Sequence, residues 1–293
     1  MIRWNPLGVA FVALIGCGER RTVEPTGSSP AFHEVRLDTA DGLSGLASDP
    51  SGALWTVAER ADTVYKINLD GSEHPTTEAF RVGGVPGGID LEGIAVLDGD
   101  RFAFGTEGKV PGIATVLLGH RDGDHITVDA TIELPERTLG ITLPRNEGAE
   151  GICSVGDSLI VGLEAIGTTE GKRWAPIVFI EHGKITHVSH LFLTSDTGKL
   201  SALECAMEGT SLKGWAIERN FGVTRLLGFE LRPERKTIRP TVLMDLTVVL
   251  HGRLNLEGLA RLRDGRFVAV VDNQWKGIVG PNELLVFDRF VVH

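Results

Sequence analysis

Carboxylate side chains recur in this sequence with regular spacing, in five segments that share one pattern. Each segment carries an acidic or hydroxyl residue in an apolar run, and 14 or 15 residues later a second carboxylate ends another apolar run. The first set is Ser44, Glu92, Glu150, Glu204 and Glu257, and the second set is Glu59, Glu107, Glu164, Glu218 and Asp272. Such side chains can bind a hard cation through oxygen or transfer protons as general acids and bases. The sequence therefore indicates metal or acid–base chemistry, provided that the fold brings the five segments together.

The five segments belong to repeated units, and these units predict the fold. Members of the first set lie 48, 58, 54 and 53 residues apart. Within a unit, apolar runs alternate with hairpin signals such as Asp98-Gly99 and Asp122-Gly123. Each unit is expected to form four strands, and the strand that the last unit lacks can come from residues 32–37. We predict an all-β fold, a five-bladed β-propeller of four-stranded blades whose ring is closed by the N-terminal strand.

On a propeller blade, the first strand lines the central channel and the second strand returns beside it. Both sets of carboxylates should therefore gather at one end of the channel, where like charges cannot all remain ionised without compensation. We expect a Ca²⁺ ion there, because this ion accepts many oxygen ligands in flexible geometry. Its expected ligands are Ser44, Glu92, Glu150, Glu204 and Glu257. Few histidines and no paired cysteines lie near these positions, which argues against zinc. The alternative is that the acidic residues only bind backbone N–H groups where strands begin.

Basic residues follow the second set and have two interpretations. They are Arg60, Lys109, Lys172, Arg173, Arg219 and Lys276. They can surround the channel mouth and hold an anionic substrate, or they can pair with neighbouring carboxylates. Other chemistry is poorly supported, because the sequence has no Gly-x-Ser-x-Gly motif and its segment 167–172 lacks the spacing of a phosphate-binding loop.

The beginning of the chain predicts export. Residues 1–17 combine Arg3, a short apolar run and Leu14-Ile15-Gly16-Cys17, which resembles a bacterial lipobox with Cys17 as the lipidated residue. Residues 18–31 are polar enough to be a flexible tether, and residues 32–293 would form the propeller domain. We expect a lipoprotein of the bacterial cell envelope, on the periplasmic or surface side of a membrane and attached through its lipid only. It is also expected to be a monomer.

Charge and cysteine content restrict the possible partners and bonds. The 293 residues carry a net charge of −10, which is unsuited to nucleic-acid binding. Cys153 and Cys205 could pair in an oxidising compartment. However, aligning Glu150 with Glu204 gives them the same strand parity, so we expect them to be two separate buried thiols.

Three parts of the chain resemble a known family. Residues 216–222 (AIERNFG) with 225–229 (RLLGF), residues 255–259 (NLEGL) with 270–273 (VVDN), and residues 146–152 (NEGAEGI) look like segments of the phytase-like domain, also called the esterase-like activity of phytase family. The resemblance covers roughly residues 35–290 and implies an exported, calcium-binding propeller with phosphoester or ester hydrolase activity. Asn220 replaces the usual Asp, and Cys205 replaces the glycine after Glu204. The axial set is also similar to that of the calcium-activated nucleotidase (apyrase) family of five-bladed propellers, although Glu204 stands where that family has a serine.

These observations favour a calcium-dependent phosphoester hydrolase. Glu107 or Glu164 would orient or deprotonate water, and Arg219 would hold the anionic substrate. Further substrate contacts are expected from Arg60, Lys109 and Asn273. The alternative is a non-catalytic binding or scaffold propeller with a structural cation. A lactonase-like hydrolase would share the acidic channel, but such proteins usually have six blades and Asn among the ligands.

Overall fold

A computed structural model of the chain describes residues 32–69, 71, 75–108, 110–220, 222–250, 255–273 and 280–288. The leader with Cys17, the tether, Lys109 and Lys276 lie outside these residues. The described part contains 22 strands and two four-residue helices, α1 (Glu136–Leu139) and α2 (Thr247–Leu250), so the prediction of an all-β chain is confirmed. Neither helix in this part is long and apolar enough to cross a bilayer.

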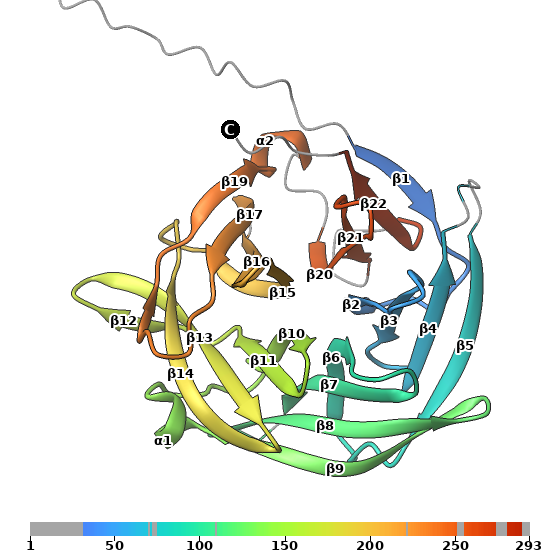
Figure 1. Cartoon of the computed structure of the whole chain (residues 1–293), viewed down its shortest axis with the longest axis horizontal. Coiled ribbons are helices and arrows are strands. Elements are labelled where there is room, and N and C mark those ends of the chain that lie inside the picture. The colour runs from blue at the N-terminus through green and yellow to red at the C-terminus, as the bar shows by residue number, and fades with distance from the viewer. Residues whose placement is uncertain are drawn as a thin grey trace, which may run out of the picture.

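The strands follow one another in antiparallel groups around a common centre (Figure 1). From the centre outward, the first group is β2 (Leu43–Ser48), β3 (Leu54–Ala58), β4 (Thr63–Asn68) and β5 (Thr76–Gly83). The second group is β6 (Ile89–Val96), β7 (Arg101–Gly108), β8 (Ile113–Asp122) and β9 (His125–Pro135). The third group is β10 (Ala149–Val155), β11 (Ser158–Leu163), β13 (Lys172–Glu181) and β14 (Lys184–Phe192), with β12 (Gly167–Thr169) beside β13.

The fourth group is β15 (Lys199–Glu208), β16 (Ser211–Asn220), β17 (Val223–Glu230) and β19 (Thr241–Asp245). The fifth group combines the two ends of the described chain, in the order β20 (Asn255–Arg261), β21 (Phe267–Asp272), β22 (Glu283–Phe287) and β1 (Phe32–Arg36). As predicted from residues 32–37, the N-terminal strand pairs antiparallel with the C-terminal one, with Val35 opposite Leu284. Parallel pairing joins β5 to β9, and β14 to the short β18 (Thr237–Ile238).

Apolar side chains fill the space between each two neighbouring groups. Of the five clusters in the described residues, one packs β3 of the first group against β7 of the second, where the Trp55 and Phe102 ring centroids lie 4.9 Å apart. Another joins the fifth group to the first through residues such as Val268 and Leu43. The core is therefore distributed around the ring, in the spaces between neighbouring strand groups, rather than gathered in one place.

The innermost strands β2, β6, β10, β15 and β20 contact one another in cyclic order, so they form a closed ring. Glycines permit this close approach. A Cβ atom on Gly151 would lie 2.5 Å from the backbone nitrogen of Leu203, and one on Gly258 would lie 2.6 Å from the carbonyl carbon of Gly45. Every inner strand also has a register shift against its partner, and the residues omitted from the pairing are Gly45, Glu92, Glu150, Ser201 and Glu257.

The Gly151→Ala variant is expected to lower the free energy of unfolding by about 1–3 kcal/mol, because the added methyl group overlaps a backbone atom that cannot move without opening the ring. Urea denaturation measures this change. Gly87→Ala is the matched control, because a Cβ atom there meets no atom within 4 Å. Equal stability of the two variants would contradict the close approach of β10 and β15.

The expectation of separate thiols is wrong, because Cys153 and Cys205 form a disulfide with their Cα atoms 5.8 Å apart. The register shifts of β10 and β15 align Glu150 with Ser201 instead of Glu204. Cys153 then lies three residues after Glu150, whereas Cys205 lies four residues after Ser201. Because side chains alternate along a strand, the two cysteines point to opposite faces of their strands. The bond joins the inner strands of the third and fourth groups.

Replacing both cysteines by alanine is expected to cost about 2–4 kcal/mol of unfolding free energy, because the disulfide closes a chain segment with a sequence separation of 52. Urea denaturation with and without dithiothreitol measures the effect. Reductant should destabilise the wild-type protein to a similar degree and leave the double variant unchanged. A wild-type protein that is insensitive to reductant under conditions that reduce the bond would refute this expectation.

Candidate functional site

Four of the five residues in the predicted first set meet at the centre of the ring. Ser44, Glu92, Glu150 and Glu257 are all buried, and the Ser44 hydroxyl donates a hydrogen bond to Glu92 Oε2 at 3.1 Å. Glu150 and Glu257 line the same narrow space, together with the close-packed residues of the inner strands. These side chains come from four different strand groups, so the ring brings distant parts of the sequence into one cluster.

The fifth member of the predicted set is different. Glu204 does not occupy the equivalent position, because the register shift of β15 falls at Ser201. Ser201 is buried and donates a hydrogen bond to the Leu256 carbonyl oxygen at 2.8 Å. Glu204 lies three residues farther along the strand and accepts the backbone N–H groups of Cys205 and Arg261 at 2.9 and 3.3 Å. Burial raises the pKa of Glu204 to about 7, despite these hydrogen bonds.

The second set mostly follows the prediction. Asp272 is the last residue of β21 and accepts a hydrogen bond from Asn255 Nδ2 at 3.0 Å. Glu59 and Glu164 directly follow β3 and β11, and Glu107 is near the end of β7. Equivalent ends of the second strands therefore place these carboxylates beside the first set.

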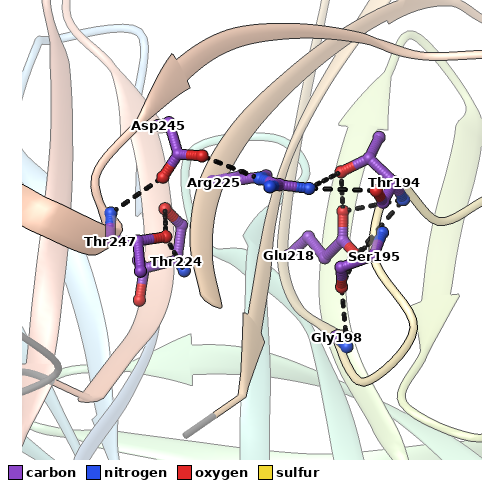
Figure 2. A network of polar contacts seen from close by, with 8 residues as sticks. All are labelled: Thr194, Ser195, Gly198, Glu218, Thr224, Arg225, Asp245 and Thr247. Carbon is purple, nitrogen blue, oxygen red and sulfur yellow. Dashed lines mark hydrogen bonds and ion pairs between the residues drawn. The ribbon is translucent and has the colours of Figure 1, made fainter. Parts of the chain in front are cut away.

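Glu218 is the exception in the second set, because it turns away from the cluster. Its carboxylate is fully buried and accepts hydrogen bonds from the backbone and hydroxyl groups of Thr194 and Ser195 (Figure 2). Arg225 connects the same loop to Asp245, with Nη1 3.0 Å from the Thr194 carbonyl oxygen and Nε 3.0 Å from Asp245 Oδ2. This network fixes residues 194–198, which lead directly into β15. Glu218 therefore has a structural role.

Arg219 takes the place in the second set that was predicted for Glu218. In the pairing of β15 with β16, Glu218 lies opposite Leu200, whereas Arg219 lies opposite Lys199. The Arg219 guanidinium forms an ion pair with Glu257, bonding to both carboxylate oxygens. Lys199 Nζ lies 2.8 Å from Glu147 Oε1 and 3.4 Å from Glu164 Oε1. The fourth group thus contributes two cations to a cluster that is otherwise acidic.

The remaining predicted basic and polar residues are dispersed. Arg60 is exposed and close to Glu59 and Glu107. Its positive charge partly opposes the rise in their pKa values that burial causes. Arg173 donates to the Gly198 carbonyl oxygen at 2.8 Å, which helps to hold the loop before β15. Asn273 contacts Asp41 and Asn282 where the chain ends meet, so it supports ring closure and does not face the cluster. Lys172 is exposed on β13.

Burial and mutual repulsion dominate the electrostatics of the cluster. Burial, followed by the charges of neighbouring carboxylates, raises the pKa values of Glu92 and Glu150 well above the usual range. The same causes raise the pKa of Glu59 to about 8. Burial raises the pKa of Glu257 to about 7, although the Arg219 charge opposes the shift. Burial and the charge of Glu164 also raise the pKa of Glu107. Protons, Arg219 or an added cation must therefore compensate these groups.

The donor set has the chemistry of a hard-cation site, since it consists of carboxylate and hydroxyl oxygens without Cys or His. As the side chains lie, no group of three or more Asp, Glu, His or Cys residues in the described ranges is arranged to hold a metal ion. The oxygen chemistry thus fits Ca²⁺, but side-chain rotation would have to bring the ligands together.

Comparison with known proteins identifies a family for most of the chain. A family model described as "Phytase-like: Esterase-like activity of phytase" matches residues 38–275, which include the whole cluster. A comparison with curated protein sequences found no match.

Solved structures with a similar fold differ widely in sequence. The allergen Mala s 1 of Malassezia sympodialis has a TM-score of 0.54 at 9% identity, over 89% of this chain and 98% of the allergen. The PQQ-bound aldose sugar dehydrogenase of Streptomyces coelicolor has a TM-score of 0.50 at 12% identity, over 89% and 99% of the two chains. A thermostable family-43 glycoside hydrolase has a TM-score of 0.53 at 6% identity, over 86% and 90%. Likeness at these identities shows a propeller-like fold alone.

Proposed function

The chain belongs to the phytase-like family, and we propose that it is a phosphoester hydrolase with its active site at the carboxylate cluster. One observation carries this proposal: buried and partly exposed carboxylates from several strand groups converge at one end of a closed ring of strands. Perturbed carboxylates in such a position are typical of catalytic sites. We also interpret the five strand groups as the blades of a five-bladed propeller, a proposal supported by the cyclic contacts of the inner strands.

We propose Ca²⁺ as the cofactor, held by Ser44, Glu92, Glu150, Ser201 and Glu257. Ser201 replaces Glu204 in this set because it occupies the equivalent position on β15. When bound, the ion would stabilise negative charge on a phosphoryl oxygen.

Glu107 is the best candidate for the general base. It is partly exposed, accepts no hydrogen bond from other described residues, and has a pKa raised by burial and by Glu164, which makes its carboxylate a stronger base. Glu164 is held by Lys199 and can orient the attacking water. Arg60 is the exposed cation near these groups that an anionic substrate could contact. Lys199 is paired with Glu147 and Glu164 and Arg219 with Glu257, so either becomes available only if it leaves its carboxylate partners.

The test of the proposed function is hydrolysis of phosphomonoester, phosphodiester, nucleotide and carboxylic ester substrates, each with Ca²⁺ and with EGTA. We expect calcium-dependent turnover of at least one phosphoester. Turnover of esters alone would change the substrate class. The absence of turnover on every substrate would refute the enzymatic proposal.

One observation favours a second candidate, a binding or scaffold propeller without catalysis. The bidentate pairing of Arg219 with Glu257 already compensates part of the cluster, which a purely structural centre requires. This candidate predicts that Glu107→Gln leaves the binding of the protein to its partners unchanged. It also predicts that Ca²⁺ raises the melting temperature although no substrate is hydrolysed.

We further propose that the protein is exported and lipid-anchored at Cys17. The disulfide between Cys153 and Cys205 supports export, because such bonds persist in oxidising compartments. Fractionation of cells that express the wild-type and Cys17→Ala proteins tests the anchor. The wild-type protein should partition with membranes, whereas the variant, which has no cysteine to be lipidated at position 17, should not. A wild-type protein recovered without lipid would contradict the proposal.

A further inference from the structure

The fourth strand group carries cations at positions where the other groups carry neutral or acidic residues. Near the end of the second strand of the fourth group, Arg219 takes the position where each of the other groups has a carboxylate. Those carboxylates are Glu59, Glu107, Glu164 and Asp272. On the inner strand of the same group, the position equivalent to Asp90 of β6 is taken by Lys199. Arg219 and Lys199 lie opposite each other in the sheet. The ring of carboxylates is therefore interrupted by a basic sector.

Arg219 points into the cluster and is already engaged there. Both Nε and Nη2 bond to the Glu257 carboxylate, and the guanidinium also interacts electrostatically with Glu150 and Glu164. Burial lowers the pKa of Arg219, but the three carboxylates outweigh this effect and the net shift is upward. A guanidinium is always charged and matches a carboxylate in a two-point contact. Arg219 therefore supplies one permanent positive charge at the carboxylates proposed to bind Ca²⁺.

A second observation indicates that Arg219 does not complete the compensation of the cluster. Glu150 is only 8% exposed and lines the narrow central space, yet it accepts no hydrogen bond from any other described residue. A buried carboxylate without a hydrogen-bond donor is costly unless it is protonated or meets a cation. Glu150 thus leaves ligand oxygens for an ion, whereas both oxygens of Glu257 accept from the Arg219 guanidinium and Oε1 also accepts from Asn255 Nδ2 at 2.7 Å.

We propose that Arg219 is a built-in counter-cation of the carboxylate cluster, and that a divalent cation binds only by displacing its guanidinium from Glu257. This inference rests on the cation site of the proposed function, but it assigns Arg219 a different role from that of a substrate clamp. The side chain lowers the affinity for divalent cations and stabilises the cluster when no cation is bound. Its removal should therefore have opposite effects on the metal-free and the metal-bound protein.

The experiment compares Ca²⁺ binding by isothermal titration calorimetry and melting temperature in EDTA for wild type, Arg219→Gln and Arg219→Lys. Arg232→Gln is the matched control, since it removes the same charge from an ion pair with Glu230 on β17 that is away from the cluster. We expect Arg219→Gln to bind Ca²⁺ about tenfold more tightly, or more, and to melt at a lower temperature in EDTA. Arg219→Lys keeps the charge but loses the two-point contact, and its affinity should lie between those of wild type and Arg219→Gln.

The outcomes separate this inference from the proposed function. If wild type and Arg219→Gln bind Ca²⁺ equally well, Arg219 is no competitor and the inference is overturned, while the calcium site remains. If only Arg219→Gln binds Ca²⁺, the inference is supported and calcium is removed from the proposed function. If neither protein binds Ca²⁺, both are overturned. If Arg219→Gln fails to fold, the comparison of Arg219→Lys with wild type decides: unchanged affinity overturns the inference.

Discussion

The metal-free protein is expected to lose on the order of 5 kcal/mol of unfolding free energy between pH 5 and pH 9. The pKa of Glu59 is raised to about 8 and that of Glu257 to about 7, from an ordinary value of 4.5. In this pH range the folded protein retains protons that the unfolded chain has already released. The stability that these two groups contribute is thus fully present below pH 4.5 and is lost as the pH rises towards 7 and 8.

Urea denaturation in EDTA at each pH unit measures this loss. Saturating Ca²⁺ should flatten the dependence, because a cation compensates the ionised carboxylates without protons. Glu59→Gln should also flatten it, since this variant removes the carboxylate whose pKa is raised to about 8. Stability that is constant or rises from pH 5 to pH 9 in EDTA would refute the crowding of these carboxylates.

The Glu107→Gln variant is expected to reduce kcat about 10²- to 10⁴-fold on the phosphoester that the wild-type protein hydrolyses. The amide keeps the size of the side chain but cannot accept a proton from water. Because Glu107 is repelled by Glu164 and Asp90, the neutral side chain should leave the melting temperature unchanged or raise it. Loss of activity would then reflect chemistry and not unfolding.

Glu133→Gln is the matched control for this variant, because Glu133 is exposed on the outer strand β9, far from the inner strands. Its kcat should equal that of the wild-type protein. If Glu107→Gln retains kcat within about threefold, Glu107 does not act as the base, and Glu164→Gln becomes the decisive variant.

Much of the fold could be predicted from the sequence because local signals agree with the global arrangement. Asp-Gly turns between apolar runs mark the hairpins, and Asp122-Gly123 indeed lies at the turn between β8 and β9. The incomplete last unit indicated that residues 32–37 pair with the C-terminal strand. Four members of the first set meet at the centre as expected because each precedes a Gly at the register shift of its strand. The residue left out of the pairing is the Glu itself in β6, β10 and β20, and Gly45, the neighbour of Ser44, in β2.

The fourth unit could not be aligned in the same way, and the errors there have one cause. Leu203-Glu204 imitates Leu256-Glu257, but β15 is shifted at Ser201, three residues earlier. The error misplaced Glu204 and Glu218, missed Lys199 and gave Cys153 and Cys205 the wrong relative parity. A signal was present, since Leu200-Ser201-Ala202-Leu203 matches Leu43-Ser44-Gly45-Leu46 in type and order. Which strand residue is left out of the pairing is decided by packing against the neighbouring inner strands, and a single strand does not encode that choice.

The melting temperature of Glu150→Gln at pH 8, measured in EDTA and in Ca²⁺, tests most directly whether buried carboxylates from successive strand groups share one centre that needs a cation. We predict that the variant melts above the wild-type protein in EDTA, because an amide needs neither a proton nor a counter-ion to be buried among these carboxylates, and that it gains less from Ca²⁺ than the wild-type protein does. A variant that melts at or below the wild-type temperature in EDTA, and that responds to Ca²⁺ as strongly as the wild-type protein, would contradict this account.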